Sequence, residues 1–324
     1  MGLPAALEGR LRLPMIGAPM FIVSRPALVI AQCKAGIVGA FPALNARPQA
    51  LLDDWIVEIT EALDEYSAAH PDEPVAPFAV NQIVHQSNSR LYADMETCVK
   101  REVPIIITSL RPPDDVVKAV HDYGGLVFHD VISLRHARKA MAQGVDGIIA
   151  VCAGAGGHAG TLSPFALVKE IRREFDGTII LSGCMSHGGD VLAALSMGAD
   201  LAYFGTRFIA TDEAHALPEY KNMIVDSAAA DIVYSSLFSG VHGNYLKGSV
   251  VNAGYDADNL ADGDKNKLST MDFSKRDKNE QKAWRDIWSA GQGVGSVAEV
   301  MPAGELVMRL QQEYEAARAR LGVA

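Results

Sequence analysis

Cysteine, positive charge and long apolar runs are all scarce in this sequence of 324 residues. The 4 cysteines form no C-x-x-C pair, and the 9 histidines show no clustered spacing, so we expect neither a disulfide framework nor a metal site. A formal net charge of -10 disfavours nucleic acid and anionic membrane surfaces as partners. No segment approaches the ~18 apolar residues of a membrane span, and the N-terminus lacks the apolar core of a signal peptide. We therefore expect a cytoplasmic protein.

Short apolar segments of β type alternate with longer helical patterns through the first two thirds of the chain. The eight expected strands are 15–20, 37–41, 78–81, 104–109, 126–131, 147–151, 178–182 and 200–205. The expected helices between them include 48–69, 88–101, 133–143, 164–175 and 188–197. Continuous apolar strands are typical of a parallel sheet that is buried on both faces. Eight successive β-α units favour a closed α/β (β/α)₈ TIM barrel over an open doubly wound sheet.

The alternation fails from about Leu217. We interpret residues 1–216 as the barrel core with the cofactor site, and residues 217–324 as a C-terminal extension that completes the same domain and packs near the barrel mouth. Residues 255–282 are crowded with Asp, Asn and Lys, which is typical of an exposed loop or small lid. A final amphipathic helix is expected over 302–321.

The most informative segment is GIIAVCAGAGGHAGTLSPF, residues 147–165. A glycine-rich backbone can approach a flat or anionic ligand closely, and His158 within it can act as an acid or a base near neutral pH. The loop also fits the weak dinucleotide pattern G-x-G-x-x-A from Gly154. That pattern requires a helix that begins inside the glycines, whereas the helix signal begins at Ser163. A mobile turn with a surface histidine is the third interpretation.

The ends of the last two expected strands carry small residues. In a (β/α)₈ barrel the loops after all strands open on one face, where the active site lies. Ser182 and Gly183 end one strand, and Gly205 and Thr206 end the next; in many barrels such loops offer backbone N–H groups to a phosphate. Together with the glycine-histidine loop one strand earlier, they predict a flat cofactor with a phosphate tail. FMN meets that description.

Five ordered motifs resemble the nitronate monooxygenase family, formerly called 2-nitropropane dioxygenases. They are PMIGAPM at 14–20, AVNQ at 79–82, AGAGGHAG at 153–160, GADLAYFGTRF at 198–208 and SAGQGVG at 289–295. The resemblance implies an FMN-containing (β/α)₈ barrel that oxidises small alkyl nitronates with O₂, giving a carbonyl compound and nitrite.

The same resemblance implies roles for individual residues. His158 matches the catalytic histidine of the family. The cofactor-binding residues fall into two groups. Those expected at the isoalloxazine ring are Ala18, Met20, Asn81 and Gly157. Those expected at the phosphate are Gly183, Gly205 and Thr206, with Ser182 at the same strand end as Gly183. Asp130 completes the set, at a strand end where many members carry a lysine.

Several departures leave the substrate open. Gly154 and Ala155 stand where many members have an acid or a cysteine, and Cys184 stands where many have a second glycine. We expect a small-molecule substrate and O₂ as partners, and a homo-oligomer is compatible with the sequence. If protonated, His158 would neutralise a nitronate; if neutral, it would remove the α-proton of a nitroalkane. Two alternatives stay open, an FMN-dependent enoyl-thioester or quinone reductase that uses NAD(P)H, and a flavin-binding protein without catalytic activity.

Overall fold

The computed structural model describes residues 2–111, 115–264 and 285–322. Its centre is an eight-stranded parallel sheet in the order β1-β9-β8-β6-β5-β4-β3-β2. The strands are β1 (Met15–Gly17), β2 (Gly39–Pro42), β3 (Phe78–Val84), β4 (Ile105–Leu110), β5 (Leu126–Val131), β6 (Gly147–Val151), β8 (Thr178–Ser182) and β9 (Leu201–Phe204). Hydrogen bonds from Gly17 N to Val38 O (2.7 Å) and from Val38 N to Met15 O (3.2 Å) join the two ends of the sheet. The TIM-barrel prediction is confirmed.

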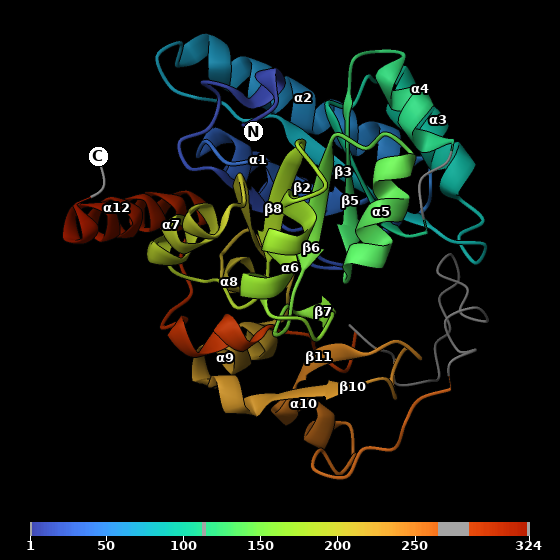
Figure 1. The fold of residues 1–324 in the computed structure, drawn as a ribbon, viewed down its shortest axis with the longest axis vertical. Helices are drawn as coiled ribbons and strands as arrows, with labels where there is room; N and C mark the ends of the chain where they lie inside the picture. Colours follow the sequence, from blue (N-terminus) through green and yellow to red (C-terminus); the bar gives the residue numbers. More distant parts are fainter. Residues whose placement is uncertain (1, 112–114, 265–284, 323–324) are drawn as a thin grey trace.

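Helices surround this barrel (Figure 1). They are α1 (Pro26–Lys34), α2 (Leu51–Ala69), α3 (Leu91–Lys100), α4 (Val116–His121), α5 (Leu134–Ala142), α6 (Pro164–Arg172), α7 (Gly188–Met197) and α8 (Thr206–Ile209). Local signals set their ends. The Ser133 hydroxyl accepts from His136 N at the start of α5, and Pro164 opens α6, where a missing N–H costs nothing. Gly198 ends α7 in the left-handed region at φ 103°, which glycine adopts without strain.

Apolar residues alternate between two cores along each barrel strand. Ile105 and Ile107 of β4 lie in the core that fills the barrel. Ile106, between them, lies in the core that joins the barrel to its helices. Both faces of the strand are thus removed from water, which explains why these strands are apolar without interruption.

Five of the eight barrel strands differ in their bounds from the sequence prediction, and in β2 and β4 the shift is only one or two residues at each end. The first strand ends at Gly17 instead of residue 20, because Met20 N donates to the Ser24 hydroxyl (3.0 Å) in a turn instead of joining the sheet. The third continues to Val84, since it pairs with β4 over that whole length. The last ends at Phe204, and Gly205 is the N-cap of α8.

The C-terminal part contains a small antiparallel sheet that the apolar patterns of the sequence do not predict. Its order is β10 (Ile232–Ser235), β11 (Gly243–Leu246) and β7 (Gly157–His158). Figure 1 shows this sheet beside the barrel with α9 (Pro218–Asp226) and α10 (Lys247–Asn252). The short helices η1 (Ala5–Leu7), η2 (Ala43–Asn45), η3 (Ala229–Asp231) and η4 (Gln292–Ser296) complete the loops. The glycine-histidine loop therefore belongs to this sheet as much as to the barrel.

The last helix, α12 (Ala303–Leu321), packs against α7 in the outer ring (Figure 1). A Cβ at Gly188 would lie 1.9 Å from the Leu310 carbonyl oxygen, so only glycine allows this approach. Gly188 N also donates to the Glu313 carboxylate (2.7 Å). Of the expected loop or lid at 255–282, residues 265–282 lie outside the described residues. No helix in the described part of the chain has both the length and the apolarity to cross a membrane.

Candidate active site

A cavity of about 420 Å³ opens where the barrel strands end, a size within the range of roughly 300–1,000 Å³ for small-molecule sites. All ten predicted site residues line it: Ala18, Met20, Asn81, Asp130, Gly157, His158, Ser182, Gly183, Gly205 and Thr206. The sequence separates the first and last of them by almost 190 positions, and the barrel brings them together because every strand ends on this face. Among the described residues, no group of three or more His, Cys, Asp and Glu side chains could hold a metal ion.

His158 lies on β7 with its imidazole held by Ser239. His158 Nε2 is 2.8 Å from the Ser239 hydroxyl oxygen, and that hydroxyl donates its single proton to the Val241 carbonyl (2.9 Å). With the Ser239 proton on the Val241 carbonyl, Nε2 donates to Ser239, and the basic nitrogen of the neutral imidazole is then Nδ1. Burial lowers the pKa of His158 to about 4. The histidine is consequently neutral at physiological pH.

Residues far along the chain hold the glycine-histidine loop. Gly157 N donates to the Ser289 hydroxyl (2.5 Å), which donates to the Asn244 carbonyl (3.0 Å). Gln292 N donates to the Gly154 carbonyl (2.8 Å). These bonds join the loop to β11 and to the segment that begins η4. These hydrogen bonds tie a loop that is rich in glycine to fixed elements, which favours an ordered loop over a mobile turn.

Two glycines of this loop serve chain packing instead of a ligand. A Cβ at Gly154, where φ is +78°, would lie 2.2 Å from the Cys184 sulfur, and one at Gly156 would lie 2.9 Å from Gly291 N. Gly157 also has a positive φ, +74°, which favours glycine, but it differs in space, because a Cβ there would meet only the Ser289 hydroxyl, at 3.8 Å. The dinucleotide interpretation does not fit either, since α6 begins at Pro164, well after the glycines.

The ends of β8 and β9 form a second side of the cavity. Gly183 has φ +132°, a conformation that L side chains rarely adopt. At Gly205 a Cβ would lie 3.6 Å from Ala18 Cβ and 3.8 Å from Met20 Sδ, which are ordinary contact distances, so the protein itself has room for alanine there. Thr206 Oγ1 accepts a hydrogen bond from Gly291 N (2.8 Å). Its own hydroxyl proton can therefore be donated elsewhere.

Three polar side chains connect β3, β4 and β5 in the cavity wall. Asn81 Nδ2 donates to the Ile107 carbonyl (3.2 Å) and to the Ser109 hydroxyl (2.8 Å). Ser109 donates in turn to Asp130 Oδ2 (2.5 Å). Burial raises the pKa of Asp130 to about 6, and the Ser109 hydrogen bond opposes that rise. This wall therefore carries a carboxyl group that titrates near neutral pH.

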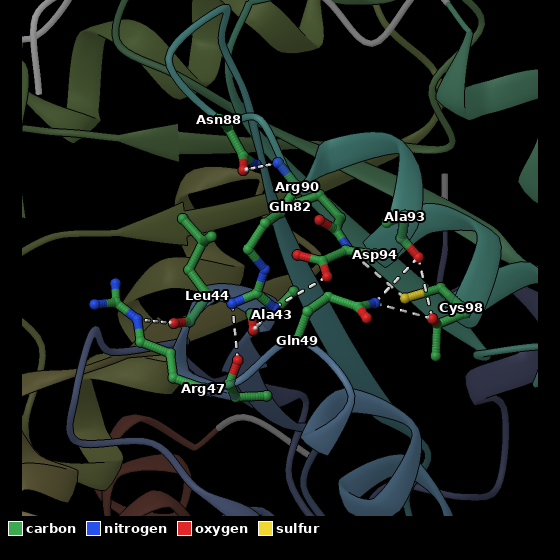
Figure 2. A network of polar contacts seen from close by, with 12 residues as sticks. Ala43, Leu44, Arg47, Gln49, Gln82, Asn88, Arg90, Ala93, Asp94 and Cys98 are labelled. Carbon is green, nitrogen blue, oxygen red and sulfur yellow. Dashed lines mark hydrogen bonds and ion pairs between the residues drawn. The ribbon is translucent and has the colours of Figure 1, made fainter. Parts of the chain in front are cut away.

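A buried ion pair supports the segment behind Met20 (Figure 2). Arg90 donates to the Ala43 and Ala46 carbonyls (3.2 and 2.8 Å) and pairs with Asp94 (3.0 Å), whose side chain is fully buried. These contacts hold η2, and Asn45 at its end accepts from Ile22 N (2.8 Å) and donates to the Met20 carbonyl (3.0 Å). The network thus holds one wall of the cavity in place, although Arg90 and Asp94 do not line the cavity themselves.

Comparison with known proteins identifies the family of this chain. The model of the family described as nitronate monooxygenase matches residues 9–313. The chain belongs to the nitronate monooxygenase family. It is 26% identical to a nitronate monooxygenase of Paraburkholderia phytofirmans over 93% of this chain and 92% of that protein. It is 30% identical to one of Neurospora crassa over 92% of this chain and 88% of that protein.

The fold also matches a solved structure of nitroalkane oxidase from Streptomyces ansochromogenes. The TM-score is 0.76 at 25% identity, and the match covers 98% of this chain and 100% of that one. Family membership and this likeness identify the chain as an oxidoreductase of the nitronate monooxygenase type.

Several residues around this cavity were not predicted from the sequence. Ser239, Asn244 and Ser289 hold the glycine-histidine loop, and Tyr220 lines the cavity and donates to the Ser289 carbonyl. All come from the C-terminal part, after the β-α alternation ends. The SAGQGVG motif at 289–295 was the available signal, because it includes Ser289 and the turn that meets Gly154 and Thr206.

Proposed function

We propose that this chain is an FMN-dependent nitronate monooxygenase that oxidises small alkyl nitronates with O₂ to a carbonyl compound and nitrite. The observation that carries the proposal is one cavity in which a neutral histidine, His158, lies among glycine backbone at the strand ends. FMN held there would supply the redox chemistry between the electron-rich nitronate and O₂, and the residues of the cavity would position both.

The residues present fit FMN. The cavity walls beside Ala18 and Met20 are apolar and suit a flat ring. At Gly205 the protein contacts alone do not require glycine, so a ligand that occupies this space explains why no side chain is there. The Thr206 hydroxyl has a proton to donate, as a phosphate oxygen requires. Gly183 and Gly205 with Thr206 would hold the phosphate, and Gly157 and Asn81 would meet the ring.

The charge state of His158 decides between its two possible roles. A pKa of about 4 leaves no positive charge to hold a nitronate at neutral pH. The neutral imidazole, protonated at Nε2 toward Ser239, can instead accept a proton at Nδ1. We therefore assign His158 as the general base that removes the α-proton of a nitroalkane, which generates the nitronate inside the cavity.

The test is an absorption spectrum followed by an anaerobic substrate screen. The purified protein should show bands near ~370 and ~450 nm, as expected of a bound oxidised flavin. Nitronate should bleach these bands under anaerobic conditions, and O₂ should restore them with release of nitrite. Rapid bleaching by NAD(P)H instead of nitronate would favour the enoyl-thioester or quinone reductase. A flavin that neither compound reduces would favour a binding protein.

A further inference from the structure

Exposed apolar side chains line the mouth of the cavity on the side of β4 and β5. Leu110 ends β4 and Ile132 follows β5, and both line the cavity although their exposed fractions are 39% and 41%. Ile132 lies close to the glycine-histidine loop, because a Cβ at Gly160, two residues after His158, would be 2.9 Å from Ile132 Cβ. A substrate group that extends from His158 toward this side of the mouth therefore meets Ile132.

The backbone holds Leu110 in a conformation that leucine rarely adopts. Its φ is +80°, in the left-handed region, which costs free energy for a residue with a Cβ. Asparagine tolerates this region better, and its polar side chain would also suit contact with water. The chain thus has a leucine where neither the backbone nor the solvent favours one. Such outliers cluster at ligand sites.

The apolar surface continues outside the cavity. Leu162 and Phe165 follow Gly160 in the chain and are exposed as well. Exposed apolar side chains that occur singly are ordinary, but a group of four at the edge of a cavity is typical of a ligand-binding groove. Since Leu110 and Ile132 belong to the cavity itself, the occupant that this position favours is the outer part of the molecule that reacts inside.

The same mouth offers no partner to a negatively charged group. The described residues that line the cavity include no lysine or arginine and one acidic residue, Asp130. Arg111 follows Leu110 in the chain but does not line the cavity. A carboxylate on the substrate would lose water here without gaining a cation, which is costly. The nitronate charge at the reacting end differs, because His158 has then taken up the α-proton.

We propose that Leu110 and Ile132 select the substrate by its chain, so that the cavity takes neutral primary nitroalkanes with an extended alkyl chain and rejects those that bear a carboxylate. This inference rests on the proposed function. Each methylene that leaves water against these side chains should raise kcat/KM by up to about fourfold, which is the equivalent of burying one CH₂ group. The gain should come through KM, because these contacts are the same before and during the reaction.

The experiment measures kcat and KM of flavin-replete protein for nitroethane, 1-nitrobutane, 1-nitrohexane and 3-nitropropanoate, all supplied in the nitro form. The native chain is compared with Leu110→Asn, which suits the backbone conformation, and with Ile132→Lys, which places a cation at the mouth. Leu217→Asn and Val251→Lys are the matched controls, because they change exposed apolar residues that do not line the cavity.

In the native chain and both controls, kcat/KM should rise with chain length. 3-Nitropropanoate should react at least about tenfold less efficiently than 1-nitrobutane, because its carboxylate is desolvated without a partner. Leu110→Asn should flatten the rise with chain length. Ile132→Lys should reverse the preference between 3-nitropropanoate and 1-nitrobutane, since the carboxylate then has a charged donor.

Equal kcat/KM for the three nitroalkanes in the native protein would overturn the role of the mouth while leaving the proposed function intact. Native profiles in both Leu110→Asn and Ile132→Lys would do the same. Absence of turnover with every nitro compound in flavin-replete native protein would instead overturn the proposed function. If circular dichroism shows that one of the two variants does not fold, the other decides.

Discussion

Replacing His158 by asparagine separates proton removal from the later oxidation. General base catalysis typically contributes a factor of ~10² to 10⁴, so His158→Asn should lower kcat/KM for a neutral nitroalkane by that factor. The preformed nitronate needs no deprotonation and should lose much less. Flavin content should stay unchanged, because no proposed phosphate contact involves this side chain. The assay is nitrite release from each substrate, normalised to bound flavin.

The low pKa of His158 also predicts how the nitroalkane activity depends on pH. A base works in its unprotonated form, so activity on the nitroalkane falls as the pH drops through the pKa of the base. With a pKa of about 4, about 97% of the protein is active at pH 5.5, whereas a histidine at its ordinary 6.5 would be active in about one molecule in ten. The native nitroalkane rate should therefore be nearly level from pH 8 down to 5.5.

Ser239→Ala tests whether the tautomer matters. Loss of the acceptor for His158 Nε2–H removes one hydrogen bond, worth about 0.5–1.5 kcal/mol, so kcat on the nitroalkane should fall by up to about tenfold while the nitronate rate is kept. Two results would refute the role of His158 as a base: native rates on both substrates in flavin-replete His158→Asn protein, or an acid limb near pH 6.5 in the native enzyme.

Three further substitutions test the cavity. Thr206→Val should weaken FMN binding by about 1–3 kcal/mol, the value of a hydrogen bond to a charged group, and Thr206→Ser should restore the binding. Equal flavin content in the native protein and both variants after long dialysis would show that Thr206 does not bind the phosphate. Gly205→Ala should leave the free energy of unfolding of the flavin-free protein within ~0.5 kcal/mol of native, since the new Cβ meets only ordinary contacts. The same change should lower FMN affinity by about tenfold or more, because the methyl group would enter the space of the ligand. A native FMN affinity would show that no ligand occupies this space. Arg90→Met should lower the free energy of unfolding, measured with urea, by about 3–5 kcal/mol because Asp94 is left buried without its partner. The double change Arg90→Met with Asp94→Leu should recover most of it, and an unaltered Arg90→Met midpoint would contradict the support that this pair gives the cavity wall.

The barrel and the positions of its site residues could be predicted from the sequence because both depend on local patterns. A strand buried on both faces must be apolar at every position, so Ile105, Ile106 and Ile107 mark β4 without reference to the rest of the chain. Eight such strands in alternation with helices leave few topologies. Once the barrel is assumed, the strand ends must meet at one mouth, and residues such as Gly183 and Gly205 follow by position.

Only the tertiary structure decided the chemistry of those residues. The neutral state of His158 and the raised pKa of Asp130 come from burial, which depends on every segment that packs around a group instead of on its neighbours in sequence. The contact from Gly157 to Ser289 spans 132 positions, and the pairing of β7 with β11 places a glycine loop in a sheet. Neither leaves a periodic signal, since each involves isolated polar atoms that meet only after the chain has folded. The sequence by itself therefore determined which residues meet at the mouth of the barrel, and the tertiary structure determined their burial and their hydrogen-bond partners.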